Sequence, residues 1–345
     1  MASFKHLSFG NKLIYSFNLF FAILLIIAYL LPFIPPKLSS ILSIINLGLG
    51  ILLAINVVFM MYWLILLRRQ VFLSLLCILI GFNYWNSIYA FNTLSKDESN
   101  TDSTIDIMSY NVRLFNKYKW IDSDQVPQNI KQFINKQSPD ILALQDYYLD
   151  ESTDLKEFKY SYKQPAKANG KNGLAIFSNY KILNTKNLEF KETANNAIYA
   201  DIVINNDTLR VFAVHLESLK IVPNVKQLQN NDQQKLVNRI GKSFIKQQSQ
   251  AELVAQEIKN SPYKVVLCAD LNNSPVSYVS RKILGNRLRD SFKEVGQGFG
   301  KTFDFDFIPL RIDVIFVDKN LKPIEFKNFD VNYSDHYPIL TRIEI

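Results

Sequence analysis

The stretch KVVLCADLNNSP, residues 264–275, joins an apolar run of strand length to an abrupt polar end. Its valine, leucine, cysteine and alanine residues predict a buried β-strand, which the Ser-Pro pair brings to a close. Asp270 and Asn272 stand directly at that close. An aspartate in such a place is usually a turn or cap residue, so a single stretch of this kind does not define a functional site.

The same combination recurs along the chain. Polar or ionisable residues end or interrupt other apolar runs at Asn111, Asp146, His215, Asp313, Asp335 and His336. Carboxylate and amide oxygens are the ligands that a hard cation such as Mg²⁺ prefers. A histidine held by a carboxylate suits the stabilisation of a phosphoryl oxyanion. Together, these strand ends predict a site for metal-dependent phosphate chemistry.

Strand-like runs outnumber helical ones from residue 104 onward. The runs are 105–112, 140–145, 173–178, 197–204, 209–216, 264–269 and 311–317. Apolar residues at helical spacing predict helices around 126–134 and 236–258, with a shorter helix after Pro275. Helices scattered among many strands favour an α/β fold in which a mixed-sheet sandwich has helices on its outside.

The ordered motifs resemble those of the endonuclease/exonuclease/phosphatase superfamily. They are SYNVR (109–113), LQD (144–146), GLAIFS (173–178), VHLES (214–218), ADLNNSP (269–275), RIDVIF (311–316) and SDHYP (334–338). The resemblance runs from about Thr104 to the C-terminus. It implies a four-layer α/β sandwich, two packed mixed sheets flanked by helices, with the site at one edge of the sheets. It also implies a phosphoester hydrolase that uses Mg²⁺, with Mn²⁺ as an alternative.

The resemblance implies a role for each motif residue. By this resemblance, Asn111, Asp146 and Asp335 bind the metal, and Asn111 also supports the scissile phosphate. His215 contacts the phosphate, and Asn272 holds it. Asp270 orients or deprotonates the attacking water. Asp313 orients and charges His336, which stabilises the transition state. Arg113 either faces the phosphate or serves in packing or a surface ion pair.

Two positions depart from the family pattern. Asp146 stands where the family usually has a metal-binding glutamate, so the ligand is one methylene shorter. Ala269 replaces the glycine that usually precedes the catalytic aspartate, which is harmless if the local φ is negative. Neither change removes a functional group, so we expect activity, although a catalytically degenerate member stays an alternative.

The first 91 residues are apolar in a way that predicts a membrane anchor. They contain no Asp or Glu, and three long apolar runs, about 13–31, 38–67 and 71–91, each have the length of a transmembrane helix. Pro32, Pro35 and Pro36 follow the first run where a signal peptide would have a small-residue cleavage site, which favours a retained helix.

Lysine and arginine in short loops predict the orientation. Lys12 precedes the first run and Arg68 and Arg69 follow the second, whereas Lys37 alone lies between them. Positive charge marks the cytoplasmic side, so we expect an integral protein of the cytoplasmic (inner) membrane whose catalytic domain, 104–345, is extracytoplasmic. The polar stretch 92–103 reads as a linker.

Charge limits the choice of substrate. The net charge of +8 comes from 39 basic and 31 acidic residues, and five of the basic residues lie in the anchor. The remaining excess is modest for a domain that binds a nucleic-acid backbone. We expect hydrolysis of phosphodiesters by a nuclease or phosphodiesterase. A lipid head-group phosphodiesterase of the sphingomyelinase type, or a degenerate membrane-bound interaction protein, is the alternative. The partners are then the bilayer and a nucleic-acid or lipid substrate.

Overall fold

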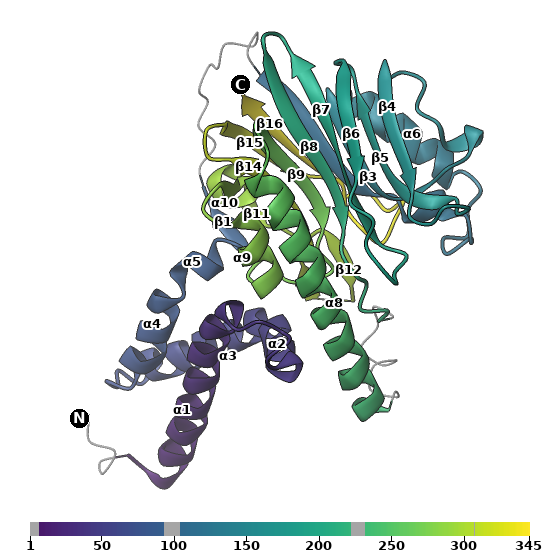
Figure 1. The fold of residues 1–345 in the computed structure, drawn as a ribbon. Helices are drawn as coiled ribbons and strands as arrows, with labels where there is room; N and C mark the ends of the chain where they lie inside the picture. The colour runs from purple at the N-terminus through teal and green to yellow at the C-terminus, as the bar shows by residue number, and fades with distance from the viewer. Residues whose placement is uncertain (1–6, 93–103, 222–231, 307) are drawn as a thin grey trace.

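Two six-stranded sheets packed face to face form the centre of the molecule (Figure 1). The computed structural model describes residues 7–92, 104–221, 232–306 and 308–345. The predicted linker, 92–103, lies outside these ranges except for its first residue. The α/β class and the two mixed sheets agree with the sequence prediction.

The first sheet has the strand order β15-β16-β2-β3-β5-β4. Its only parallel pair among the described strands is β2 with β3, which makes the sheet mixed. The strands are β2 (Thr104–Asn111), β3 (Ile141–Tyr148), β4 (Tyr160–Pro165), β5 (Asn172–Ser178), β15 (Lys322–Asn328) and β16 (Ile339–Glu344).

The second sheet has the order β10-β14-β9-β8-β7-β6, and within its described strands only β8 and β9 run parallel. The strands are β6 (Ile182–Asn187), β7 (Asn196–Ile204), β8 (Asp207–His215), β9 (Lys264–Asp270), β10 (Leu288–Asp290) and β14 (Asp313–Asp318). In each sheet, the parallel strands themselves carry predicted site residues: Asn111 and Asp146 in β2 and β3, and His215 and Asp270 in β8 and β9.

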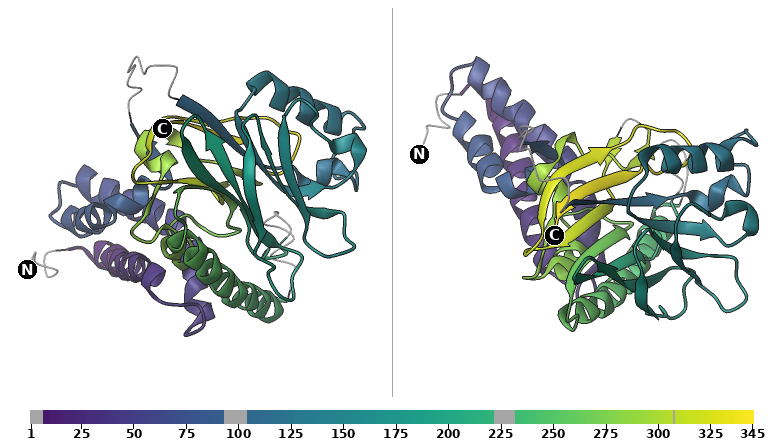
Figure 2. Two further views of the ribbon diagram at one scale, coloured as in Figure 1. Left: turned by 45° about the horizontal axis from the view of Figure 1, so that its top comes forward. Right: turned by 90° about the horizontal axis from the view of Figure 1, so that it is seen from above.

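Alternating side chains build a separate core on each face of each sheet. Ile107 and Ile141 face the second sheet and meet Val211 and Val266 in the central core. On the outer face of the first sheet, Met108 packs with α6 (Val126–Gln137). On the outer face of the second sheet lie α8 (Gln233–Lys259) and α9 (Tyr278–Leu284). The right view of Figure 2 has α6 and α8 on opposite sides of the sheets, which gives four layers.

Short elements close the edge of the sandwich at which the site lies. They are η4 (Arg113–Asn116), η5 (Glu151–Thr153), α10 (Ser291–Val295), β11 (Gln297–Phe299), β12 (Phe303–Phe305) and β13 (Ile308–Leu310). β12 and β13 form a two-stranded hairpin, and Phe303 also bridges to His336.

The N-terminal segment differs from the three continuous membrane helices that the sequence predicts. Its elements are α1 (Phe9–Leu30), η2 (Leu31–Phe33), α2 (Ser40–Leu47), α3 (Leu49–Ile65), α4 (Val71–Ile80), α5 (Phe82–Trp85) and β1 (Tyr89–Phe91). One helix of the described residues, Phe9–Phe33, is long and apolar enough to cross a bilayer. The bent pair α2–α3 would be a second, and α4 is too short to be a third.

Two glycines account for the difference. The chain bends by 54° between α2 and α3, at Gly48, whose N–H turns back to the carbonyl of Ile45. The predicted helix 71–91 instead ends at Ile80, with Gly81 as its C-cap at φ −86° and ψ 8°. A Cβ at residue 81 would lie 2.0 Å from the Tyr29 ring. The close packing of α1 therefore requires glycine at the end of α4.

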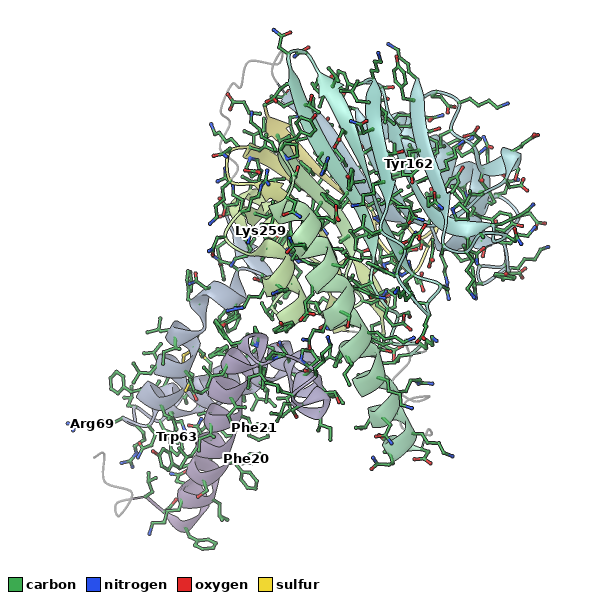
Figure 3. All side chains as sticks on the ribbon, in the orientation of Figure 1. Phe20, Phe21, Trp63, Arg69, Tyr162 and Lys259 are labelled. Atoms are coloured by element: carbon green, nitrogen blue, oxygen red, sulfur yellow. The ribbon has the colours of Figure 1, made fainter. Side chains whose placement is uncertain are left out.

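Large apolar side chains cover the outside of this anchor, as Figure 3 shows for Phe20, which is 55% exposed. Its interior holds a polar chain in which Asn18 donates to Ser74 (2.7 Å) and Ser74 donates to Asn56 (3.3 Å). An apolar exterior with hydrogen-bonded polar groups inside is typical of helices packed in a membrane.

The anchor packs directly against the catalytic domain. β1 pairs with β11, and the N–H of Lys37 donates to the side chain of Gln248 in α8 (2.9 Å). α2 lies beside α8 (Figure 1), so close that a Cβ at Gly241 would lie 2.7 Å from Ser40 Oγ. The two parts are therefore joined by backbone pairing and side-chain contacts.

Candidate active site

Strand register brings three predicted site residues into one row. His215, the last residue of β8, is the register partner of Asp270 at the end of β9. Asp313, the first residue of β14, is the antiparallel partner of the same Asp270. All three side chains are buried. Their positions follow from strand pairing, so the row is part of the sheet itself.

His336 and Asp313 form a hydrogen-bonded pair. His336 Nδ1 lies 2.9 Å from Asp313 Oδ2 and 3.2 Å from Oδ1, which leaves Nε2 on the side of Asp270, 3.8 Å from its Oδ2. Burial alone would lower the pKa of His336, but the charges of Asp313 and Asp270 outweigh it and raise the pKa to about 10. The imidazole is therefore charged at neutral pH.

His215 lies between two carboxylates in a similar way. Its Nδ1 is 3.3 Å from Asp146 Oδ1 and its Nε2 is 3.4 Å from Asp270 Oδ2. Burial opposes protonation, but Asp146 and then Asp270 raise the pKa of His215 to about 9. Both histidines thus offer positive charge to one place, beside Asp270.

Asp270 itself is held by two amides. Asn111 Nδ2 donates to its Oδ2 (2.9 Å), and the backbone N–H of Asn272 donates to its Oδ1 (2.9 Å). The side chain of Asn272 donates to the carbonyl of Leu216 (3.0 Å), and φ at Asn272 is +47°. Asn272 therefore shapes the turn after β9, and its contact with a phosphate stays a prediction.

The two departures from the family pattern have clear structural settings. Ala269 is a buried strand residue without a positive φ, paired with Val314, so its methyl group is accommodated in the core. Asp146 sits where the β3–β5 register shifts, with φ +47°. Such a bulge re-aims a side chain, and here Asp146 meets His215.

Arg113 packs and pairs within the site. Its guanidinium lies 4.5 Å from the centre of the Trp120 ring and 3.2 Å from Asp335 Oδ2. Arg113 begins a run of four residues with positive φ, up to Asn116. Backbone strain of this kind concentrates at functional sites. A role for Arg113 toward the phosphate stays a prediction.

The described residues offer oxygen and nitrogen ligands for a cation. Asp270, Asp313 and His336 have ligand atoms within 4.8 Å of one another. This group differs from the predicted ligands Asn111, Asp146 and Asp335. Asp313 already binds His336 Nδ1, whereas the carboxylates of Asp146 and Asp335 are partly exposed and line the same cavity as Asp270. Carboxylate oxygens are the ligands that a hard divalent cation prefers.

Sequence reasoning missed two supporting hydroxyls. Thr302 Oγ1 accepts the N–H groups of Ile312 and Asp313 (3.0 Å each), which fixes the start of β14. Ser334 Oγ donates to the carbonyl of Asn111 (2.8 Å) and accepts the N–H of His336 (3.2 Å). Ser334 lies inside the SDHYP motif and could have been found there, whereas Thr302 has no sequence signal.

A single cavity of about 1080 Å³ contains this site. Most predicted site residues line it: Asn111, Arg113, Asp146, His215, Asp270, Asn272, Asp335 and His336. Asp313 lies behind His336. The anchor contributes to the same cavity through Asn46, Leu47, Leu49, Gly50, Ile51 and Ala54, which the sequence did not predict.

The fold is a two-sheet α/β sandwich with buried histidine–aspartate pairs at one edge, an arrangement suited to phosphate chemistry. The family model for the endonuclease/exonuclease/phosphatase family matches residues 108–336, about two thirds of the chain. The chain belongs to this family, whose members hydrolyse phosphoester bonds. Residues 11–88 match a second model, a domain of unknown function (DUF8431). No curated protein matches the chain in sequence.

Solved structures share the fold at low identity. TDP2 from D. rerio in complex with a single-strand DNA product is 17% identical, with a TM-score of 0.54, over 70% of this chain and 100% of that one. A family protein from Bacteroides vulgatus is 19% identical, with a TM-score of 0.54, over 70% and 99%. The human Nocturnin catalytic domain with bound sulfate is 17% identical, with a TM-score of 0.53, over 70% and 93%.

Proposed function

We propose that the protein is a membrane-anchored, metal-dependent phosphodiesterase. The observation that carries the proposal is the arrangement of His336 on Asp313, with Asp270 between His336 and His215. A phosphodiester anion needs positive charge on its oxygens and a base for the attacking water. Both requirements are met within one cavity.

Each site residue has a separate role in the hydrolysis of the phosphodiester. Asp270, fixed by Asn111 and the N–H of Asn272, takes a proton from water as the water oxygen bonds to phosphorus. The bond from phosphorus to the leaving alcohol breaks, the alkoxide takes up a proton from solvent water, and Asp270 returns its own proton to the solvent. The charged His336 and His215 neutralise the phosphoryl oxygens. The products are a phosphomonoester and an alcohol, and no covalent intermediate with the protein is required.

Asn111, Asp146 and Asp335 would hold the cation, Mg²⁺ or Mn²⁺. A bound divalent cation supplies further positive charge to the phosphoryl oxygens. Asp146 is shorter than the usual glutamate, but its position on the bulge of β3 brings its carboxylate to the cavity.

Membrane anchoring rests on α1 and the bent pair α2–α3, whose outer surfaces are apolar. The N-terminal end of α1 meets the C-terminal end of α3, because Tyr62 donates to Asn11 (2.7 Å). Lys12, Arg68 and Arg69 therefore share the end of the anchor away from the catalytic domain, as Figure 3 shows for Arg69. From this end, α4 and α5 return the chain to β1, which pairs with β11 of the catalytic domain. By the positive-inside rule, the catalytic domain is then extracytoplasmic and the membrane is the cytoplasmic one.

The test uses the full-length chain, because the anchor packs on the catalytic domain. The protein is held in amphipol and given bis(4-nitrophenyl) phosphate with Mg²⁺, with Mn²⁺ or with chelator. We expect metal-dependent turnover that Asp270→Ala and His336→Ala each lower by about 10²-fold or more. Asp207→Asn, at the opposite end of β8, is the control and keeps its activity.

A folded, metal-binding wild type without turnover on this ester, on DNA or RNA, or on sphingomyelin would contradict hydrolysis. The chain would then be better described as a degenerate interaction protein. Turnover that survives both Asp270→Ala and His336→Ala would place the chemistry elsewhere. A preference for DNA or RNA over other diesters would make the enzyme a nuclease.

A further inference from the structure

The cavity has a polar end and an apolar remainder. The catalytic histidines and carboxylates occupy one part of its wall. The wall also includes apolar residues of other elements, among them Leu236 and Ile240 of α8, Phe299 of β11 and Phe305 of β12. A cavity of about 1080 Å³ is slightly larger than the range of about 300–1,000 Å³ usual for small-molecule sites. It therefore has room for much more than a phosphate group.

The anchor completes the apolar part. Gly50 and Ala54 lie one turn apart on α3 and both line the cavity, as residues four apart share a helix face. Ile51 also lines the cavity and is still 53% exposed. The cavity wall is thus continuous with the apolar outer surface of α3, the surface that faces lipid if the anchor is in a bilayer.

Asn46 joins α2 to the loop that borders the cavity. It lines the cavity and is only 4% exposed. Its Nδ2 donates to the carbonyl of Val276, and its Oδ1 is itself buried and has no hydrogen-bond partner among the described residues. Asn46 therefore fixes the position of α2 beside the cavity.

Charge argues against a polyanion. Among the described lining residues, only Arg113, Lys220 and Arg311 are lysine or arginine. Arg311 is buried and paired with Asp290, and Arg113 is paired with Asp335. A nucleic-acid backbone requires several free cations along its track, and the described lining residues do not offer such a row.

We propose that the substrate is a phosphoester with a hydrocarbon chain, and that α2 and α3 form the part of the binding site that holds this chain. The phosphate lies at the catalytic end, and the chain extends along Gly50 and Ala54 toward the bilayer. This inference rests on the proposed function, since the catalytic end supplies the phosphate site. The anchor is then a specificity element as well as an attachment.

The test measures how kcat/KM depends on chain length. The full-length protein in amphipol is given the ethyl, hexyl and octyl esters of 4-nitrophenyl phosphate below their micelle concentrations. Each buried methylene contributes up to about fourfold in affinity. We therefore expect the octyl ester to exceed the ethyl ester by at least about tenfold, even if the chain is buried only in part.

Two variants of α3 and a control test whether the dependence on chain length arises at this helix. Gly50→Leu and Ala54→Phe place bulk in the cavity and should reduce the octyl-to-ethyl ratio by about tenfold. A Cβ at Gly50 meets only Ile88, at 3.9 Å, so the substitution introduces no clash at its root. Leu64→Phe is the control, because Leu64 is an exposed residue of α3 that is not part of the cavity wall, and it should keep the wild-type ratio.

A second measurement separates this inference from the proposed function. Binding of hexylphosphocholine and of glycerophosphocholine is measured in chelator, where turnover is absent. Tighter binding of the hexyl compound, lost in Ala54→Phe, supports the chain site even if no ester is hydrolysed. Hydrolysis with equal rates for all chain lengths, or a ratio unchanged in both cavity variants, overturns the chain site while the hydrolase remains. A single-stranded DNA oligonucleotide cleaved with a higher kcat/KM than the octyl ester also overturns it.

Discussion

The side-chain amide of Asn46, in the anchor, donates a 3.1 Å hydrogen bond to the backbone carbonyl of Val276, 230 residues further along the chain. Val276 lies just before α9, in the loop that follows the catalytic strand β9. Lys37 adds a second link, through its N–H to Gln248 and its ammonium to Glu252 (3.6 Å). The anchor thus holds the loop next to Asp270 and Asn272.

Asn46→Ala should weaken this docking. The substitution leaves the Val276 carbonyl without a donor, at a cost of about 1–3 kcal/mol. Removal of the unpaired Oδ1 offsets part of this cost, so we expect a loss of about 1 kcal/mol. The measurement is a lower thermal midpoint together with faster hydrogen exchange in α2 and in the loop before α9. Ser43→Ala is the control, since its hydroxyl bonds only to Ser39 within the same helix. Equal exchange in both variants would show that the contact is energetically neutral.

Asp313→Asn tests whether catalysis needs the negative charge of Asp313 or only the size and hydrogen-bonding position of its side chain. Asparagine can still contact His336 Nδ1, but it cannot stabilise the imidazolium, so the pKa of His336 falls toward its ordinary value of about 6.5. We expect kcat to fall by about 10²–10⁴-fold and the alkaline limb of the pH–rate profile to move to lower pH. Asp207→Asn is the matched control. An unchanged alkaline limb would mean that His336 does not act as the charged form.

Asp146→Asn should weaken metal binding. The variant loses a charged oxygen ligand, so the Mg²⁺ concentration for half-maximal activity should rise about tenfold or more. Asp146→Glu, which restores the usual family residue, should stay within a few-fold of the wild type. Asp150→Asn serves as the control, because Asp150 caps the short helix η5. If titration of activity with Mg²⁺ gives the same midpoint for all four proteins, Asp146 is not a ligand.

Stability should fall as the pH rises in metal-free protein. The pKa of His336 is raised in the fold to about 10 by Asp313 and Asp270, which outweigh burial. A raised pKa stabilises the fold fully below the unfolded value of about 6.5, and this contribution is lost as the pH rises toward 10. With chelator present, the thermal midpoint should decrease from pH 7 to 10. The decrease should be smaller in His336→Gln. Parallel curves for the two proteins would contradict a charged His336.

The catalytic strands were predictable because each one carries its own signal. The run before Asp270 and the run after Asp313 are apolar and short, and strand pairing then aligns their polar ends without further information. Thr302 was not predictable, because its function is to accept two backbone N–H groups, which a threonine in any loop could do. Its role exists only once β14 has been placed.

The anchor was predicted only in part, for a physical reason. Apolar residues that face lipid, a neighbouring helix or a cavity have the same composition, so Gly50, Ile51 and Ala54 carry no mark of their position. The close packing at Gly81 involves Tyr29, 52 residues earlier in the chain, which hydropathy does not report. Hydropathy therefore predicted three continuous spans where packing gives one long helix, a bent pair and a short helix.

The pairing of β1 with β11 has a consequence for kinetics. With the anchor in a bilayer, a catalytic domain clamped in this way stands at a constant height and cannot swing out into the aqueous phase. If the substrate is the chain-bearing phosphoester proposed above and resides in the bilayer, encounter is two-dimensional, and the rate follows the mole fraction of substrate in the host membrane rather than its bulk concentration. Proteoliposomes free of substrate, mixed with substrate vesicles under conditions that prevent fusion and lipid exchange, should form no product.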